Sequence, residues 1–227
     1  MLDTAYCLAQ TLAISLPTVI DAARGRLTRE ACDERLVTWA QKLVARADAR
    51  VTVTGGPADW SQAYVIMSNH QSHFDIPIVC YVVRGTVRMV AKKELFRIPI
   101  FGRAMREAEM ICIDREDRAS AIASLRAAGD LIASGVSVWI APEGTRSKTG
   151  RLGHLKKGGF MLAHETGAPI LPLAISGTHA ILPPGSAIIK RGKSVRVHLG
   201  EPVQTRGVAV DDLMGKVRTF FEKSVQE

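Results

Sequence analysis

Several features that define common protein classes are scarce in this 227-residue chain. Aromatic residues make up 5% of it, and it carries no Lys/Arg-rich tail. Because base-stacking surfaces need aromatic rings among cations, we expect no nucleic-acid partner. No internal repeat or low-complexity linker interrupts the sequence. The length therefore predicts one large domain, or one domain with an appendage.

Cysteines are few and widely separated, at Cys7, Cys32, Cys80 and Cys112. They form no C-x-x-C pair, so we expect reduced thiols in a cytosolic setting rather than a disulfide framework. Apart from His70, the histidines lack the spacing of metal ligands, and we expect them to be structural; they are His73, His154, His164, His179 and His198. The sequence thus predicts no metal site.

Two motifs of nucleotide-binding proteins and hydrolases are incomplete. Gly192-Lys193-Ser194 matches the end of a P-loop, but Ala187 stands where its first glycine is required. The chain contains no G-x-S-x-G turn, so a serine-hydrolase triad lacks its nucleophile.

What the chain does have is a net charge of +8, which favours an anionic partner such as a phosphate ligand or an acidic lipid surface.

Residues 1–50 carry two helical patterns. The stretch from Thr4 to Ile20 has no charged residue, yet it is short and polar for a membrane-spanning helix and lacks the positive start of a signal peptide. A second pattern, from Thr28 to Arg46, places apolar residues among arginines and lysines. We expect an amphipathic helical hairpin that lies in a membrane interface; the alternative is that both helices simply cover the core.

Residues 51–227 alternate between strand-like and helix-like segments. Seven segments rich in Val and Ile predict strands, at 51–54, 64–68, 87–91, 110–114, 136–141, 170–176 and 195–199. Helical periodicity appears between or after them, at 76–83, 117–134, 156–166 and 211–223. The pattern predicts an α/β domain with a mostly parallel, mixed sheet of about seven strands flanked by helices.

Polar residues follow the carboxyl ends of five predicted strands, where ligand sites of open α/β sheets gather. The most informative of these clusters is Ser68-Asn69-His70-Gln71-Ser72-His73-Phe74-Asp75. An imidazole can accept a hydroxyl proton near neutral pH, and a carboxylate fixes its tautomer and stabilises the resulting cation. On a regular helix His70 and Asp75 would lie roughly 140° apart. We therefore predict a turn leading into a helix, with Asp75 as its N-cap.

A second cluster, Pro142-Glu143-Gly144-Thr145-Arg146-Ser147, has the chemistry of an anion site. Arg146 offers a planar fork for phosphate oxygens, Gly144 permits close approach of the backbone, and Glu143 could orient the arginine or accept a substrate hydroxyl. The cations that follow favour this interpretation over a merely charged turn; they are Lys148, Arg151, Lys156 and Lys157.

The stretch from Lys92 to Gly102 mixes cations with a strongly apolar loop. It fits phosphate steering together with acyl-chain contact by Leu95, Phe96, Ile98, Ile100 and Phe101, and it fits equally a solvated charge run beside core residues. Arg115 could reach the same phosphate, or pair on the surface with Asp114 or Asp117.

The order and spacing of four blocks resemble the glycerolipid acyltransferase family, closest in type to the bacterial 1-acylglycerol-3-phosphate acyltransferases. The blocks are Asn69–Asp75, Lys93-Glu94-Leu95 through Arg115, Pro142–Ser147, and Ala168-Pro169-Ile170-Leu171-Pro172. The resemblance runs from about residue 64 to 178, and its first and third blocks are the specific ones.

The resemblance implies that His70, held by Asp75, deprotonates the free hydroxyl of a lysophosphatidate, which attacks the thioester of acyl-CoA or acyl-carrier protein. It implies no metal, no cofactor and no covalent acyl-enzyme. It assigns phosphate binding to Glu143, Gly144, Thr145, Arg146, Arg115 and Lys93, and an acyl or thioester pocket to Pro172. It also implies a peripheral or monotopic protein on an anionic surface, the cytoplasmic face of the inner membrane. Two alternatives stay open: another lysophospholipid, lyso-aminolipid or glycerol-3-phosphate acceptor, or a non-catalytic membrane-binding protein.

Overall fold

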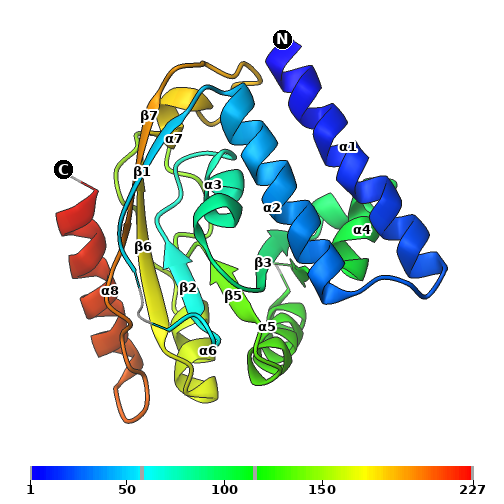
Figure 1. The fold of residues 1–227 in the computed structure, drawn as a ribbon. Coiled ribbons are helices and arrows are strands. Elements are labelled where there is room, and N and C mark those ends of the chain that lie inside the picture. Colours follow the sequence, from blue (N-terminus) through cyan, green and yellow to red (C-terminus); the bar gives the residue numbers. More distant parts are fainter. Residues whose placement is uncertain (1, 57–58, 115–116, 226–227) are drawn as a thin grey trace.

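A seven-stranded mixed sheet forms the centre of the computed structural model, which describes residues 2–56, 59–114 and 117–225 (Figure 1). The strands are Arg50–Gly55 (β1), Val65–Ser68 (β2), Val87–Lys92 (β3), Ile111–Ile113 (β4), Ser137–Ile140 (β5), Ile170–Ser176 (β6) and Ser194–Leu199 (β7). Their order is β1-β7-β6-β2-β5-β3-β4, with only the β6–β7 pairing antiparallel among the pairs described. The predicted fold class is confirmed, and each strand lies within one residue of its predicted ends.

Helices cover both faces of the sheet. One face packs against Arg29–Arg46 (α2), Asp75–Val82 (α3) and Thr178–Ile181 (α7), and the other against Arg118–Ala133 (α5), Gly158–Thr166 (α6) and Val210–Ser224 (α8). Strand β2 is buried on both sides because Ile66 faces the first layer, whereas Val65 and Met67 face the second. This explains why β2 reads as a continuous apolar run rather than an alternating one.

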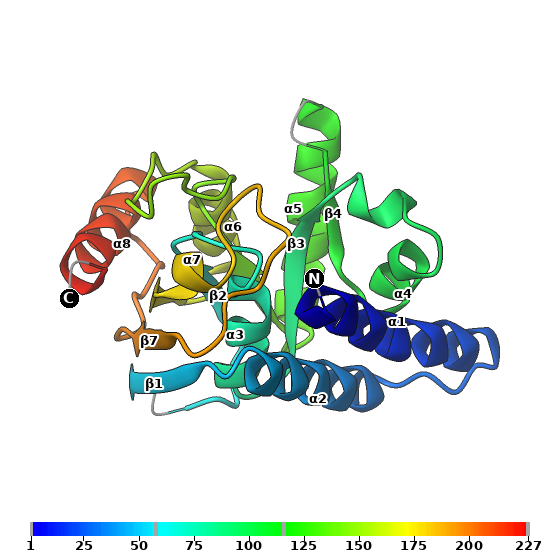
Figure 2. The same ribbon diagram turned by 90° about the horizontal axis from the view of Figure 1, so that it is seen from above.

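The N-terminal segment forms a helical hairpin, Leu2–Ala23 (α1) followed by α2. Figures 1 and 2 show α1 lying outside α2 and beside Phe101–Glu107 (α4), against which it packs. Thr28 caps α2 by accepting a hydrogen bond from the Ala31 amide at 3.2 Å. Helix α2 packs in turn against α3 and the face of the sheet that α3 covers.

Helix α1 carries its apolar residues outward. Leu8, Leu12, Leu16 and Ile20 recur every four residues and are 38–67% exposed, whereas Ser15 on the inner face is buried. This is the reverse of a helix on a water-soluble surface, which turns its apolar stripe toward the core. The helix extends beyond the charge-free stretch at both ends. At 22 residues it is long and apolar enough to cross a membrane, contrary to the expectation that it is too short.

One short helix lies within the predicted loop from Lys92 to Gly102, and a second begins at its end. They are the 3₁₀ turn Leu95–Arg97 (η1) and α4. Between them Ile100 has φ +64° and ψ −59°, and the Phe101 amide donates to the Pro99 carbonyl at 2.7 Å. This tight three-residue turn is uncommon for a β-branched residue. Local sequence propensity therefore did not predict a helix directly after this turn.

Candidate active site

The turn after β2 is bonded to the strands on either side. Asn69 lies between β2 and β6, where its side chain donates to the Ile175 carbonyl at 2.8 Å and accepts from the Ile175 amide at 2.7 Å. Ser68 accepts a hydrogen bond from the Trp139 indole of β5 at 3.0 Å. These buried bonds fix where the chain leaves the sheet, so the residues that follow have little freedom of position.

His70 and Asp75 meet in this turn. The His70 Nδ1 and Asp75 Oδ2 atoms are 2.7 Å apart, and the carboxylate is fully buried. Asp75 Oδ2 also accepts the amides of Gln71 at 2.7 Å and Ser72 at 2.9 Å, while Oδ1 accepts the Thr178 hydroxyl at 2.5 Å. With the Nδ1 proton bonded to Asp75, the free lone pair of the imidazole is on Nε2.

The predicted turn into a helix is confirmed, but the capping role of Asp75 is wrong. Asp75 is the first residue of α3, and Phe74 occupies the cap position without a side-chain cap bond. The Asp75 carboxylate points back to the amides of the preceding turn instead of forward to those of the helix. Its negative charge at the first helical turn still interacts favourably with the helix dipole.

Glu143 holds the backbone of the turn that contains His70. Its Oε1 accepts the His70 amide and its Oε2 the Gly153 amide, both at 2.8 Å, and the residue is 6% exposed. Burial raises the pKa of the Glu143 carboxyl, while these hydrogen bonds and the nearby His70 oppose the rise. Ser147 also holds this turn, because its amide donates a hydrogen bond to the His70 carbonyl at 2.7 Å. The 142–153 loop thus binds both backbone groups of His70.

His70 opens into a cavity of about 1070 Å³ at the carboxyl ends of the parallel strands. The cavity is lined at its polar end by Gly144, Thr145, Arg146, Lys92, Lys148 and Lys156. Gly144 has φ +72°, and a Cβ atom there would lie 3.1 Å from Cε of Lys156. Glycine at this position therefore lets the lysine lie against the loop, which concentrates positive charge within reach of His70.

Three of the predicted phosphate or acyl residues lie elsewhere. Lys93 forms an ion pair with Asp114 at 2.5 Å and does not line the cavity, whereas its neighbour Lys92 does. Glu143 is likewise absent from the lining, because its carboxylate bonds to backbone amides. Pro172 lies within β6 near Gly200 and borders neither described cavity. Arg115 falls outside the described residues.

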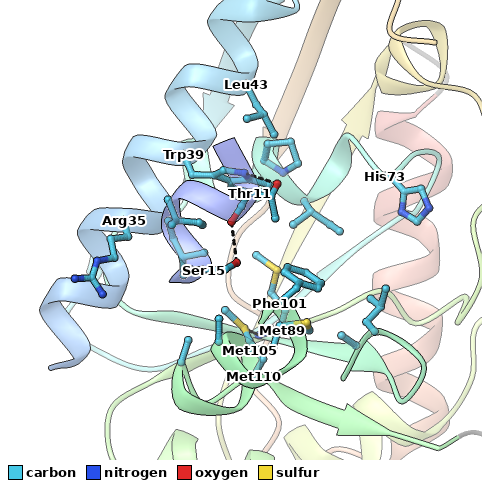
Figure 3. Close-up of a pocket in the computed structure, with 18 of the residues that line it drawn as sticks. Thr11, Ser15, Arg35, Trp39, Leu43, His73, Met89, Phe101, Met105 and Met110 are labelled. Carbon is cyan, nitrogen blue, oxygen red and sulfur yellow. Dashed lines mark hydrogen bonds between the residues drawn. The ribbon is translucent and has the colours of Figure 1, made fainter. Parts of the chain in front are cut away.

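A second, apolar cavity of about 320 Å³ lies between the N-terminal hairpin, β3 and α4 (Figure 3). Thr11 and Ser15 face it from α1, but Ser15 donates to the Thr11 carbonyl and Thr11 accepts from the Trp39 indole, so these polar groups are satisfied. Three methionines line it, Met89, Met105 and Met110. Of the apolar loop named above, Leu95 and Phe101 line this cavity, Ile98 and Ile100 are exposed, and Phe96 is buried outside the lining.

The two cavities adjoin. They share six lining residues, which are His73, Ile76, Val90, Ala91, Leu95 and Trp139. The apolar cavity beneath the hairpin therefore borders the cavity that His70 and Arg146 line. Within the described residues there is no group of three or more His, Cys, Asp or Glu side chains that could hold a metal ion.

The sequence pattern of the Acyltransferase family matches residues 50–176 of this chain, which include the His70 turn and the Arg146 loop. The chain belongs to this family. It is 37% identical over 161 residues, 71% of its length, to a chloroplastic 1-acyl-sn-glycerol-3-phosphate acyltransferase of Brassica napus, covering 46% of that protein. It is 34% identical over 154 residues to human 1-acyl-sn-glycerol-3-phosphate acyltransferase alpha, covering 67% of this chain and 54% of that one.

Among solved structures, this member of the Acyltransferase family is similar to the 1-acyl-sn-glycerophosphate acyltransferase PlsC from Thermotoga maritima. The two are 26% identical with a TM-score of 0.77, over 97% of this chain and 96% of the other. The chain spans about half the length of the curated relatives it matches most strongly. The structural match covers 97% of this chain, so the fold, including its N-terminal hairpin, is not peculiar to this sequence.

Sequence reasoning missed two parts of the site in this Acyltransferase family member. One is the role of Thr178, which binds the second oxygen of Asp75 across 103 positions; Thr178 belongs to a polar cluster predicted at this edge of the sheet, but no role was assigned to it. The other is the apolar cavity, because Met89, Met105 and Met110 become neighbours only through the crossing of β3, α4 and the following turn. No local pattern indicates that contact.

Proposed function

We propose that this protein transfers an acyl group from an acyl thioester to the free hydroxyl of 1-acylglycerol 3-phosphate, forming phosphatidate. The observation that carries the proposal is the His70–Asp75 pair, bonded at 2.7 Å and opening into a basic cavity that adjoins an apolar one. The names of the similar proteins support the same acceptor and product.

The proton path follows from the tautomer. His70 Nε2 accepts the hydroxyl proton while the acceptor oxygen bonds to the thioester carbon, and Asp75 stabilises the imidazolium that forms. When the carbonyl re-forms, the carbon–sulfur bond breaks and the leaving thiolate takes the proton from Nε2. The products are the ester and a free thiol, and no protein nucleophile is acylated. General-base catalysis contributes about 10²–10⁴-fold, so positioning of both substrates must supply much of the rest.

The acceptor phosphate binds at the basic end of the larger cavity in this proposal. Arg146 gives a planar fork, Gly144 and Thr145 precede it in the same loop, and Lys148 and Lys156 also line the cavity, with Lys156 lying against Gly144. Glu143 acts indirectly by holding the His70 amide. Arg115 and Lys93 remain proposed helpers; Lys93 pairs with Asp114 and does not line the cavity, whereas Lys92 does.

The acyl chain of the thioester occupies the apolar cavity, and the carrier, either coenzyme A or acyl-carrier protein, remains outside. Leu95, Phe101 and the three methionines form walls that an alkyl chain can contact. Pro172, proposed from the family pattern for the acyl pocket, lies in β6 beside Gly200 and is separated from β3 by β2 and β5, so any influence on the pocket is indirect.

The hairpin seats the protein on a membrane. The exposed row Leu8, Leu12, Leu16 and Ile20 offers a continuous apolar face for lipid, and the net charge of +8 favours an anionic surface. A lysophospholipid acceptor resides in such a surface. We therefore propose a peripheral or monotopic association, with the cytoplasmic face of the inner membrane as the location.

A thiol-release assay over a panel of acceptors tests the proposal. Purified protein receives acyl-CoA or acyl-carrier protein together with lysophosphatidate, glycerol 3-phosphate, a lyso-aminolipid or no acceptor, and the lipid product is identified by mass spectrometry. We expect phosphatidate from lysophosphatidate and no product from His70→Ala. His164→Ala is the matched control, since His164 is exposed on α6 and lines neither described cavity.

The outcomes separate the alternatives. Product from another acceptor only would keep the chemistry and replace the substrate. Vesicle binding without any thiol release would identify a non-catalytic membrane protein. Near-normal turnover by folded His70→Ala would remove His70 as the base.

A further inference from the structure

His73 stands at the boundary between the two cavities. Of the six residues that line both, Ile76, Val90, Ala91 and Leu95 have apolar side chains, and the Trp139 indole nitrogen already donates to Ser68. Within the described part of the chain no hydrogen bond is made by the His73 ring. His73 is therefore the residue at this boundary whose polar side chain is available to a ligand.

The boundary is where the reacting carbon must lie if the proposed function is correct, and the inference rests on that function. An acyl chain in the apolar cavity and an acceptor beside Arg146 place the thioester carbonyl between them, next to His70. The carbonyl oxygen becomes negatively charged when the acceptor attacks. Donors aimed at such a developing charge in a water-poor site are a major source of acceleration.

We propose that His73 donates an imidazole N–H hydrogen bond to the thioester carbonyl oxygen and to the oxyanion that forms from it. In this step the acceptor oxygen bonds to carbon, its proton moves to His70, and the carbonyl π electrons move to the oxygen held by His73. Collapse returns those electrons to the C=O bond, expels the thiolate and returns the proton from His70 to sulfur. His73 neither gains nor loses a proton.

The local structure suits this role. The backbone on either side of His73 is fixed, because the Ser72 hydroxyl donates to the Leu182 carbonyl at 2.7 Å and accepts the Phe74 amide at 2.9 Å. His73 is exposed overall, yet partial desolvation of its ring, together with the positive charges of Arg146 and His70, lowers the pKa of His73. A neutral ring keeps one N–H donor, and the lowered pKa makes it a weaker base than an ordinary imidazole. In the view of Figure 3 His73 lies across the apolar cavity from Arg35.

The test compares two substitutions of similar bulk in the full-length protein. His73→Leu removes the donor, and His73→Gln keeps an N–H group at nearly the same distance from the backbone. We expect His73→Leu to lower kcat by about 10²–10³-fold, the usual cost of one oxyanion donor. His73→Gln should recover at least about tenfold of that loss, with both KM values within about threefold of wild type and an unchanged Tm.

Each other outcome overturns the assignment. A kcat for His73→Leu within about fivefold of wild type excludes a donor to the transition state. A raised acceptor KM at constant kcat assigns His73 to acceptor binding, and an altered preference for acyl-chain length at constant kcat makes it a wall of the cavity. The wild-type protein separates this inference from the proposed function: active wild type with an active Leu variant refutes only the His73 role, whereas inactive wild type refutes both.

Discussion

Replacing Asp75 by Asn separates the charge of this residue from its geometry. The Asn oxygen can take the place of Oδ2, which accepts the His70 ring and the amides of Gln71 and Ser72. The Asn amide then faces Thr178, whose hydroxyl can rotate from donor to acceptor. The His70 ring and both backbone amides keep their acceptor, and Thr178 keeps a hydrogen-bond partner, so we expect the fold to persist and only the negative charge behind His70 to disappear.

The expected loss of kcat follows from the distance between the His70 ring and the Asp75 carboxylate. The Nδ1–Oδ2 separation is 2.7 Å, and both groups are largely or fully buried, His70 being 17% exposed and Asp75 0%. Charge centres about 4 Å apart at an effective dielectric constant of about 20 attract by about 4 kcal/mol, or about 10³-fold in rate. Because the imidazolium is only partly formed in the transition state, we expect Asp75→Asn to lower kcat by about 10²–10³-fold.

Steady-state thiol release with saturating lysophosphatidate measures this loss, and thermal unfolding followed by circular dichroism checks the fold. Asp75→Ala is the contrasting variant. It leaves the Gln71 and Ser72 amides buried without their acceptor, at about 1–3 kcal/mol each, so its Tm should fall where that of Asp75→Asn does not. A folded Asp75→Asn protein with kcat within about tenfold of wild type would refute the electrostatic argument.

Three further predictions concern the loop, the apolar cavity and the hairpin. Arg146→Ala should raise the acceptor KM more than the thioester KM, and an unchanged acceptor KM removes Arg146 from phosphate binding. Ala108→Phe should fill part of the apolar cavity and shift the preferred thioester toward shorter chains, measured as kcat/KM across chain lengths. Leu12→Asp with Leu16→Asp should weaken sedimentation with anionic vesicles while thioester turnover on a detergent-dispersed acceptor persists; unaltered sedimentation contradicts the lipid-facing row.

Stability should also depend on pH through Glu143. Its folded pKa is raised by burial, so the folded state holds this proton more tightly than the unfolded chain does. The contribution of this carboxyl to the free energy of unfolding is therefore complete below the ordinary glutamate range and falls as pH rises through the raised value. Urea unfolding at several pH values should show this slope in wild type and a shallower one in Glu143→Gln; equal slopes contradict it.

The sequence predicted the structure best where one local pattern corresponded to one strand or helix. Short segments rich in Val and Ile marked all seven strands, because each strand is one short run of residues that are contiguous in the sequence. The sequence was least informative around Ile100. There the positive φ value and the close approach of Gly102 to Phe96 depend on packing, so a loop was predicted where η1 and the start of α4 form.

By itself the sequence determined the types of chemical group available. A base with a carboxylate five positions away, an arginine loop after the fifth strand and a charge-free N-terminal stretch are all local, and their spacing limits what they can do. Only the tertiary structure decided which groups meet. It bonded Thr178 to Asp75, directed Glu143 to the His70 backbone instead of the cavity, and placed the leucine row of α1 outward. The physical reason is that contacts across a parallel sheet join residues far apart in sequence, and no local periodicity records them.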